Sequence, residues 1–162
     1  MAKKIKVLVV THTFPTKHNP IGAIFLLNQL EHLKKFCDIK IVFPHGYVPR
    51  FKFLNPYHRY SQIPYFETVK GMEVYHPKYL MIPRAIFKLK LLNLYISIES
   101  FFSYFSSLTV TEKIMKEWNP DVIHMHGGLS EAMLCNHLKK KYKKPLILTV
   151  YGEDVTRYLK EN

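Results

Sequence analysis

The sequence has few of the residues that define several common protein classes. It contains only two cysteines, Cys37 and Cys135, with no Cys-x-x-Cys pair and no Cys/His set at zinc-finger spacing. This pattern indicates neither a disulfide framework nor a structural zinc site, so two reduced, buried thiols in a cytosolic protein are expected. There is also no G-x-G-x-x-G fingerprint and no phosphate-binding loop ending in Gly-Lys-Ser/Thr. A dinucleotide-dependent dehydrogenase and a P-loop NTPase are therefore disfavoured.

Long apolar runs are missing as well. The first apolar run, Val7 to Val10, is too short for the core of a signal peptide and lacks a small-residue cleavage site after it. The most apolar later stretch, Leu91 to Val110, contains Glu99 and several serines. Because a membrane span needs about 20 predominantly apolar residues, no transmembrane helix is predicted.

Acidic residues are scarce relative to basic ones. The chain has 12 Asp and Glu against 24 Lys and Arg, which gives a net charge of +12. This charge attracts phosphate-bearing partners such as sugar nucleotides, anionic lipid and nucleic acid, although it also fits a solvated basic surface. No segment matches an RNA-binding motif. Nucleic-acid binding, whose affinity would fall steeply with added salt, is therefore the weakest of these interpretations.

The residues that are present predict one α/β domain over residues 1–162. Strands are expected at Ile5–Val10, Ile39–Phe43, Asp121–Met125 and Leu146–Val150, and a hairpin around Gly71 pairs Glu67–Lys70 with Met72–His76. Helices are expected at Ala23–Lys35, Ala85–Trp118 (as two helices broken near Ser97–Ser107), Leu129–Tyr142 and from Glu153 to Leu159. Alternating strands and helices predict a Rossmann-like, doubly wound, mainly parallel sheet with helices on both faces.

The best places for chemistry in such a sheet lie just beyond the carboxyl ends of the strands. The first is the loop Thr11–Phe25, in which Gly22 would let the backbone approach a phosphate or a sugar before a helix begins. An ordinary strand-to-helix turn explains these residues equally well.

The second place is His124-Met125-His126-Gly127-Gly128, at the end of a predicted strand. Alternation along the strand puts both histidines on one face, where an imidazole can hydrogen-bond sugar hydroxyls or transfer a proton. A structural role is favoured for His124. No third metal ligand is fixed by spacing, so no metal ion is expected.

The third place is the stretch from Thr149 through Tyr151, Gly152, Glu153 and Asp154, where another strand meets a helix. The two acidic residues would either cap the helix or orient an acceptor.

Together these segments resemble the N-terminal domain of family 4 retaining glycosyltransferases of the GT-B class. The resemblance spans nearly the whole chain and rests on the order of five segments: KVLVV, FPTKHNPIGAIFLLNQLEHL, VKGMEVYHPKY, NPDVIHMHGGLSEAM and LTVYGEDV. It implies that a nucleotide-sugar co-substrate reacts with retention of configuration, assisted by its own phosphate, without a cofactor or metal. The implied acceptor is a glycan or a lipid-linked molecule in cell-envelope synthesis.

The resemblance also assigns roles to residues. Gly22 and Gly127 would border the cleft, His126 would contact the transferred sugar, and the corner from Tyr151 through Gly152, Glu153 and Asp154 would line the acceptor side. Tyr151 departs from the family pattern because many relatives carry histidine there.

Members of that family have a second Rossmann-like domain that grips the nucleotide, and no such segment occurs in this sequence. We therefore expect the chain alone to be inactive and to need that C-terminal domain as its partner. The basic, aromatic stretch Arg84–Phe105 suggests peripheral attachment of this cytoplasmic protein to anionic lipid at the inner membrane face. The alternative function is a non-catalytic module that binds a nucleotide or an anionic glycan.

Overall fold

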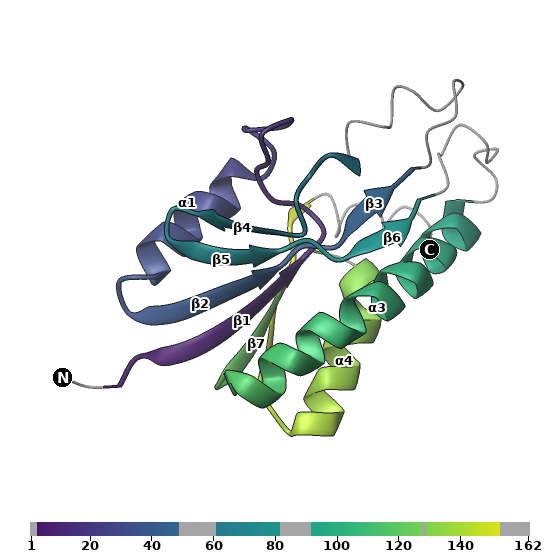
Figure 1. Ribbon diagram of the computed structural model, residues 1–162. Coiled ribbons are helices and arrows are strands. Elements are labelled where there is room, and N and C mark those ends of the chain that lie inside the picture. Colours follow the sequence, from purple (N-terminus) through teal and green to yellow (C-terminus); the bar gives the residue numbers. More distant parts are fainter. Residues whose placement is uncertain (1–2, 49–60, 82–91, 128, 153–162) are drawn as a thin grey trace.

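The main sheet is doubly wound and mainly parallel, as expected. The computed structural model describes residues 3–48, 61–81, 92–127 and 129–152 (Figure 1). The strands are β1 (Ile5–Thr11), β2 (Cys37–Val42), β3 (His45–Tyr47), β4 (Phe66–Val69), β5 (Met72–Tyr75), β6 (Lys78–Leu80), β7 (Val122–His126) and β8 (Leu146–Thr149). The helices are α1 (Ile24–Leu33), α3 (Leu92–Glu117) and α4 (Leu129–Tyr142). Six strands form one sheet in the order β4-β5-β2-β1-β7-β8, and only the edge strand β4 is antiparallel to its neighbour.

The central strand β1 has the composition of a strand that is buried on both faces of the sheet. Its residues Leu8, Val9 and Val10 are fully buried, and they point alternately to the two faces. A continuous run of β-branched and leucine side chains is typical of a strand covered by helices on both sides. The parallel neighbours β2 and β7 flank it.

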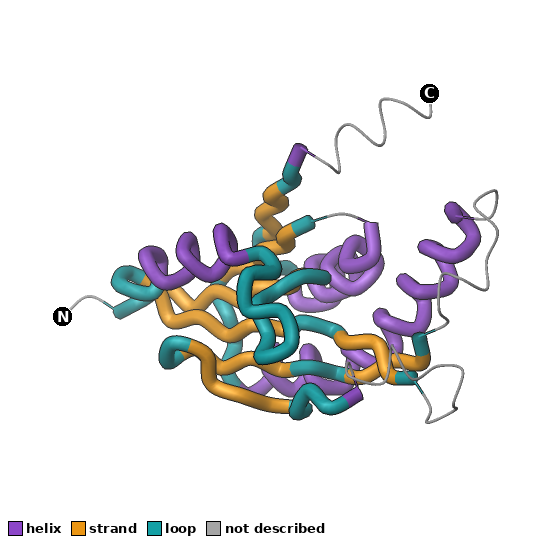
Figure 2. Tube along the Cα trace, turned by 90° about the horizontal axis from the view of Figure 1, so that it is seen from above, coloured by secondary structure: helices purple, strands orange, loops and turns teal. Residues whose placement is uncertain are grey.

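Each face of the sheet has its own apolar core. Alternate residues of the strands, such as Val9 and Ile41, pack with Leu26 and Leu30 of α1 on one face. The residues between them, such as Leu8, pack with side chains of α3 and α4 on the other face. In Figure 2, the strand layer passes between α1 and α4. Helices therefore cover both faces, which confirms the predicted class.

Helix α3 is continuous through the segment where a break was expected, so that prediction was wrong. Ser100, Ser103 and Ser107 are buried on the packed side of the helix. Hydroxyl groups in this segment donate to carbonyls of the preceding turn, as in the bond of 2.8 Å from Thr111 Oγ1 to the Ser107 oxygen. Serine and threonine can lie inside a helix when their hydroxyls are satisfied in this way. The predicted helical residues 85–91 lie outside the described residues.

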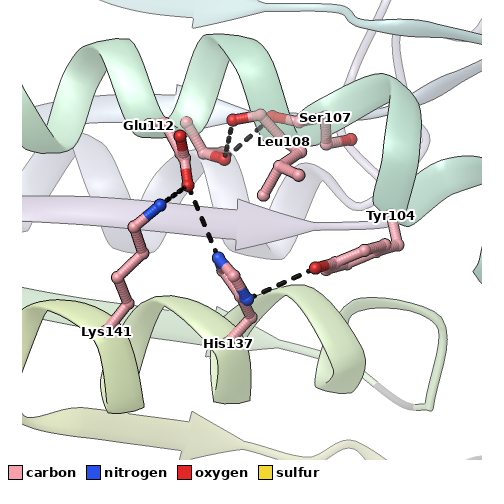
Figure 3. Close-up of polar contacts among 7 residues, drawn as sticks. Tyr104, Ser107, Leu108, Glu112, His137 and Lys141 are labelled. Carbon is pink, nitrogen blue, oxygen red and sulfur yellow. Dashed lines mark hydrogen bonds and ion pairs between the residues drawn. The ribbon is translucent and has the colours of Figure 1, made fainter.

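A polar network joins α3 to α4 along their exposed side (Figure 3). The Tyr104 hydroxyl lies 3.3 Å from His137 Nδ1, and His137 Nε2 lies 3.5 Å from Glu112 Oε1. Lys141 donates to the same carboxylate, which lowers the pKa of Glu112. The two helices run in the same direction, so this network fixes how far one is shifted along the other.

The remaining predictions on the fold have mixed outcomes. The hairpin around Gly71 is present as β4 and β5. The two-stranded parallel sheet of β3 and β6 was not predicted. Both cysteines are free and buried, as expected. Within the described segments, no helix is long and apolar enough to cross a bilayer. The helix expected from Glu153 lies outside the described residues.

Candidate functional site

The candidate site lies at the carboxyl ends of β1 and β7, where the winding of the sheet reverses. From β1 the chain reaches β2 through α1 on one face, whereas β7 is reached through α3 on the other face. Thr11 at the end of β1 is directly opposite His126 at the end of β7. Ligands of open α/β sheets bind in the crevice at such a reversal.

Two histidines and a tyrosine form a hydrogen-bonded chain at this end. His124 and His126 point to the face that carries α1, as their alternation predicted, because Ile123 and Met125 belong to the opposite core. His124 Nε2 is 2.9 Å from Thr149 Oγ1, and His124 Nδ1 is 3.2 Å from His126 Nε2. His126 Nδ1 is 2.7 Å from the Tyr151 hydroxyl. Since all four ring nitrogens are bonded, the proton positions along the chain depend on one another.

Both imidazoles in this chain are neutral at pH 7. His126 is fully buried and His124 is 8% exposed. Burial, together with repulsion from His124, lowers the pKa of His126 to about 4. Burial likewise lowers the pKa of His124. The pair therefore offers neutral donors and acceptors rather than positive charge at this position.

Tyr151 connects this chain to the loop that follows β1. Its ring makes an edge-to-face contact with Phe25 in the first turn of α1, with ring centroids 4.7 Å apart. Phe25 is half-exposed, so the contact lies at the open rim. The loop containing Gly22, the end of β7 and the end of β8 therefore meet at one rim.

Gly22 is needed in its loop for steric reasons. Its amide donates to the Asn19 carbonyl, and a Cβ on Gly22 would lie 2.4 Å from the Asn19 side-chain nitrogen. The next residue, Ala23, has a positive φ of 51°. The loop is thus a tight turn, and this packing explains the glycine without a ligand.

Gly127 leaves room at the rim for His12, a residue that sequence reasoning missed. Its φ is +99°, and a Cβ there would lie 2.2 Å from His12 Cε1. His12 directly follows β1 and is 43% exposed. Its Nδ1 is 3.3 Å from Oε2 of Glu131, which is buried in the first turn of α4. A partly exposed imidazole held by a buried carboxylate at this rim is well placed to exchange a proton with a bound hydroxyl.

The other predicted site residues are only partly described. Gly152 follows β8 at the same rim and is exposed, and a Cβ there would meet nothing within 4 Å. Glu153 and Asp154 lie outside the described residues, as does Gly128. Across the described segments, no three His, Cys, Asp or Glu side chains gather closely enough to hold a metal ion. Gly22, His126, Gly127, Tyr151 and Gly152 are thus together, while their roles stay predictions.

Comparisons with known proteins give this geometry a family context. The chain is 26% identical over 159 residues to the putative teichuronic acid biosynthesis glycosyltransferase TuaC of Bacillus subtilis (strain 168). That alignment covers 95% of this chain and 38% of the relative, so the chain spans well under half of the relative's length.

A solved structure and a family model also match. The crystal structure of CalG4, the calicheamicin glycosyltransferase, aligns over 93% of this chain and 31% of its own, with a TM-score of 0.49 and 12% identity. The glycosyl transferase 4-like family model matches residues 81–162, half of the chain. The chain therefore belongs to the glycosyl transferase 4-like family.

Proposed function

We propose that this chain is the acceptor-side half of a glycosyltransferase that moves a sugar from a nucleotide-sugar donor to a glycan or lipid-linked acceptor, with retention of configuration. The main support is the convergence of the His126–Tyr151 pair, Gly127 and His12 at the winding reversal, in a chain that belongs to a glycosyltransferase family. The donor-binding half would face this rim. Cell-envelope polysaccharide synthesis is proposed because the named relative acts in teichuronic acid biosynthesis.

Within this proposal, the Tyr151 hydroxyl contacts the bound sugar, and His126 positions that hydroxyl through its hydrogen bond. Both ring nitrogens of His126 are bonded within the protein, so a sugar reaches that imidazole only by replacing Tyr151 or by bonding through its hydroxyl. A neutral relay of this kind can adjust to either a donor or an acceptor on the sugar. No metal ion is required, because the phosphate of the donor assists the acceptor hydroxyl and the protein mainly orients groups and stabilises charge.

The first prediction concerns where transfer activity resides. The isolated 162-residue chain should show no appreciable transfer from radiolabelled UDP- or GDP-sugars, whereas the full-length gene product should transfer label from one of them. In the full-length protein, Tyr151→Phe should lower kcat/KM by about tenfold or more, a loss of about 1.4 kcal/mol in transition-state stabilisation.

Tyr142→Phe is the matched control for this measurement. Tyr142 ends α4 at the opposite end of the sheet, and its buried hydroxyl has no hydrogen-bond partner among the described residues. Its loss should leave transfer unchanged. Robust turnover by the isolated chain, or equal effects of the two substitutions, would contradict the proposal. Binding of a sugar nucleotide without any transfer by the full-length protein would favour the binding-module alternative.

We also propose that the protein attaches peripherally to an anionic membrane through an aromatic patch in the middle of α3. Phe101, Phe102 and Phe105 are exposed there, and the Phe101 and Phe105 rings are 4.7 Å apart. This aromatic patch lies toward the carboxyl end of the sheet, because α3 ends at Glu117 beside the amino end of β7 and the patch is several turns before that residue. Docking there would bring the rim close to a lipid-linked acceptor.

The second prediction tests this attachment by co-sedimentation. The chain should pellet with anionic vesicles more than with neutral ones, and Phe101→Ser/Phe105→Ser should reduce pelleting. Phe36→Ser is the control, because Phe36 is 73% exposed but lies at the end of α1 on the far side of the sheet. Equal failure with both vesicle types would remove the membrane proposal and leave the transferase proposal standing.

A further inference from the structure

The end of the sheet opposite the rim is strongly basic. Half of the 24 Lys and Arg residues lie at the amino ends of the parallel strands or in the turns and helix ends beside them. They are Lys3, Lys4, Lys6, Lys34, Lys35, Lys70, Lys116, Lys139, Lys140, Lys141, Lys143 and Lys144. The site proposed above uses none of these residues, although such a concentration of charge raises the local concentration of anions.

A cavity of 230 Å³ opens at this basic end, lined by residues that include Lys4, Lys34, Asp38 and Trp118. Lys4 Nζ donates to the Lys34 carbonyl at 3.3 Å, and Lys34 Nζ donates to the Lys70 carbonyl at 2.6 Å. Among the described residues, neither ammonium group has a carboxylate within ion-pair distance. The two ammonium groups are therefore held at the cavity by neutral acceptors, and the carboxylate of Asp38 in the same lining offsets only one of the two charges.

A glycine makes room for one of these charges. Gly71 has a φ of +72° in the turn between β4 and β5, and a Cβ there would lie 2.8 Å from Lys34 Nζ. Any other residue would be strained and would push the ammonium group away. The turn thus fixes the Lys34 ammonium group against the cavity.

Other residues of the cavity lining are held by polar and aromatic contacts. Lys40 Nζ is 2.7 Å from Glu73 Oε2 and lies over the Trp118 ring, 5.3 Å from its centroid. Lys6 donates to the Trp118 carbonyl at 2.9 Å. The exposed carboxylate of Asp38 adds a hydrogen-bond acceptor beside the lysines. The cavity thus combines cationic donors with an acceptor for hydroxyl groups.

We propose that this cavity binds a carboxylate-bearing sugar unit of an anionic glycan, away from the transfer rim. The ammonium groups of Lys4 and Lys34 would pair with the carboxylate of the sugar, and Asp38 would accept hydrogen bonds from the sugar hydroxyls. A glycan is favoured over a lipid surface because donors and acceptor lie within a cavity of sugar size. The identity of the glycan as the polymer that the enzyme extends rests on the proposed function.

The distance between the cavity and the rim suggests that the cavity retains a long glycan rather than a single sugar. The seven residues of β1 separate the two ends of the sheet by about 23 Å, at roughly 3.3 Å per residue. A single sugar cannot reach both ends, but an oligosaccharide can. The cavity therefore retains a polymer by a unit remote from its reacting end, which raises the effective concentration of that end at the rim.

The test is a fluorescence anisotropy titration of the 162-residue chain with labelled hexagalacturonate, with maltohexaose as the neutral probe of equal length. Lys4→Gln/Lys34→Gln should weaken hexagalacturonate binding by about tenfold, the equivalent of about 1.4 kcal/mol. Lys139→Gln/Lys140→Gln is the matched control, because it removes the same charge from exposed positions on α4. It should weaken binding less than about threefold, since only long-range attraction is lost. Lys4→Arg/Lys34→Arg keeps both charges and should bind like the parent.

Several results would overturn the proposal that this cavity binds a carboxylate-bearing sugar. They are equal binding of maltohexaose, equal losses from the two Gln pairs, and tighter binding of a single-stranded RNA of equal charge. Thermal melts check that each variant is folded, and the Arg pair keeps the charge hypothesis testable if the Gln pair unfolds. Because these titrations contain no nucleotide-sugar, their failure would leave the transfer result untouched, and a failed transfer assay would leave the binding result untouched.

Discussion

At pH 5 the chain should need about 4 kcal/mol less free energy to unfold than at pH 7, because two buried histidines take up protons only on unfolding. His126 has a pKa of about 4, set by burial and by His124. The pKa of His45 is also lowered to about 4, first by burial and then by repulsion from His76, Lys78 and His18. Their ordinary value of 6.5 applies once the chain unfolds.

The sign follows from which state binds more protons. Between pH 6.5 and 4 the unfolded chain holds a proton on each histidine that the folded chain does not, so stability falls as the pH falls. Each group contributes about 2 kcal/mol at pH 5. Above pH 6.5 each histidine makes its full contribution to the free energy of unfolding. Below the pKa of about 4 that each has in the folded chain, this contribution falls no further.

Urea denaturation followed by circular dichroism between pH 7 and pH 4.5 measures this loss. His126→Gln and His45→Gln should each remove about 2 kcal/mol of the loss between pH 7 and pH 5, because a neutral amide takes up no proton. His32→Gln, at an exposed position on α1, is the control and should leave the dependence intact. A flat profile for the parent chain, or unchanged profiles for both Gln variants, would refute the assignment.

The sequence predicted the parts of this structure that depend on regular patterns. The β-branched run around Val9 identifies the central strand, and alternation along β7 places His124 and His126 on one face. The hairpin at Gly71 followed from a glycine between two short strand-like runs. These features depend on local periodicity, which a single sequence carries.

The parts that escaped prediction depend on long-range packing. The strands β3 and β6 have three residues each, and their pairing joins segments about thirty residues apart, too short and too distant for a periodic signal. The continuity of α3 depends on hydroxyl groups that donate to carbonyls within the helix, as Thr111 Oγ1 does to the Ser107 oxygen. The pairing of His12 with Glu131 depends on the backbone at Gly127 and on where α4 begins. The only sequence signal for His12 was its place directly after a strand.

Gly127→Ala should destabilise the chain by about 3 kcal/mol, because the new methyl group meets both backbone strain and a direct clash. The φ of +99° is outside the region that alanine adopts without cost. The Cβ would also lie 2.4 Å from His12 Nδ1, the atom that faces Glu131. Moving the imidazole away would disturb its ion pair with that buried carboxylate.

A double-mutant cycle separates the two causes. In a His12→Ala background the clash is absent, so Gly127→Ala should cost only its backbone strain, with a coupling energy of about 1–2 kcal/mol between the positions. Gly152→Ala is the matched control, since a Cβ there meets nothing within 4 Å, and it should change stability by less than about 0.5 kcal/mol. Urea denaturation of the four members of the cycle and the control gives each value. Equal costs of Gly127→Ala in both backgrounds would mean that His12 does not lie against this glycine, and the crevice would then lack the imidazole that Glu131 is proposed to hold.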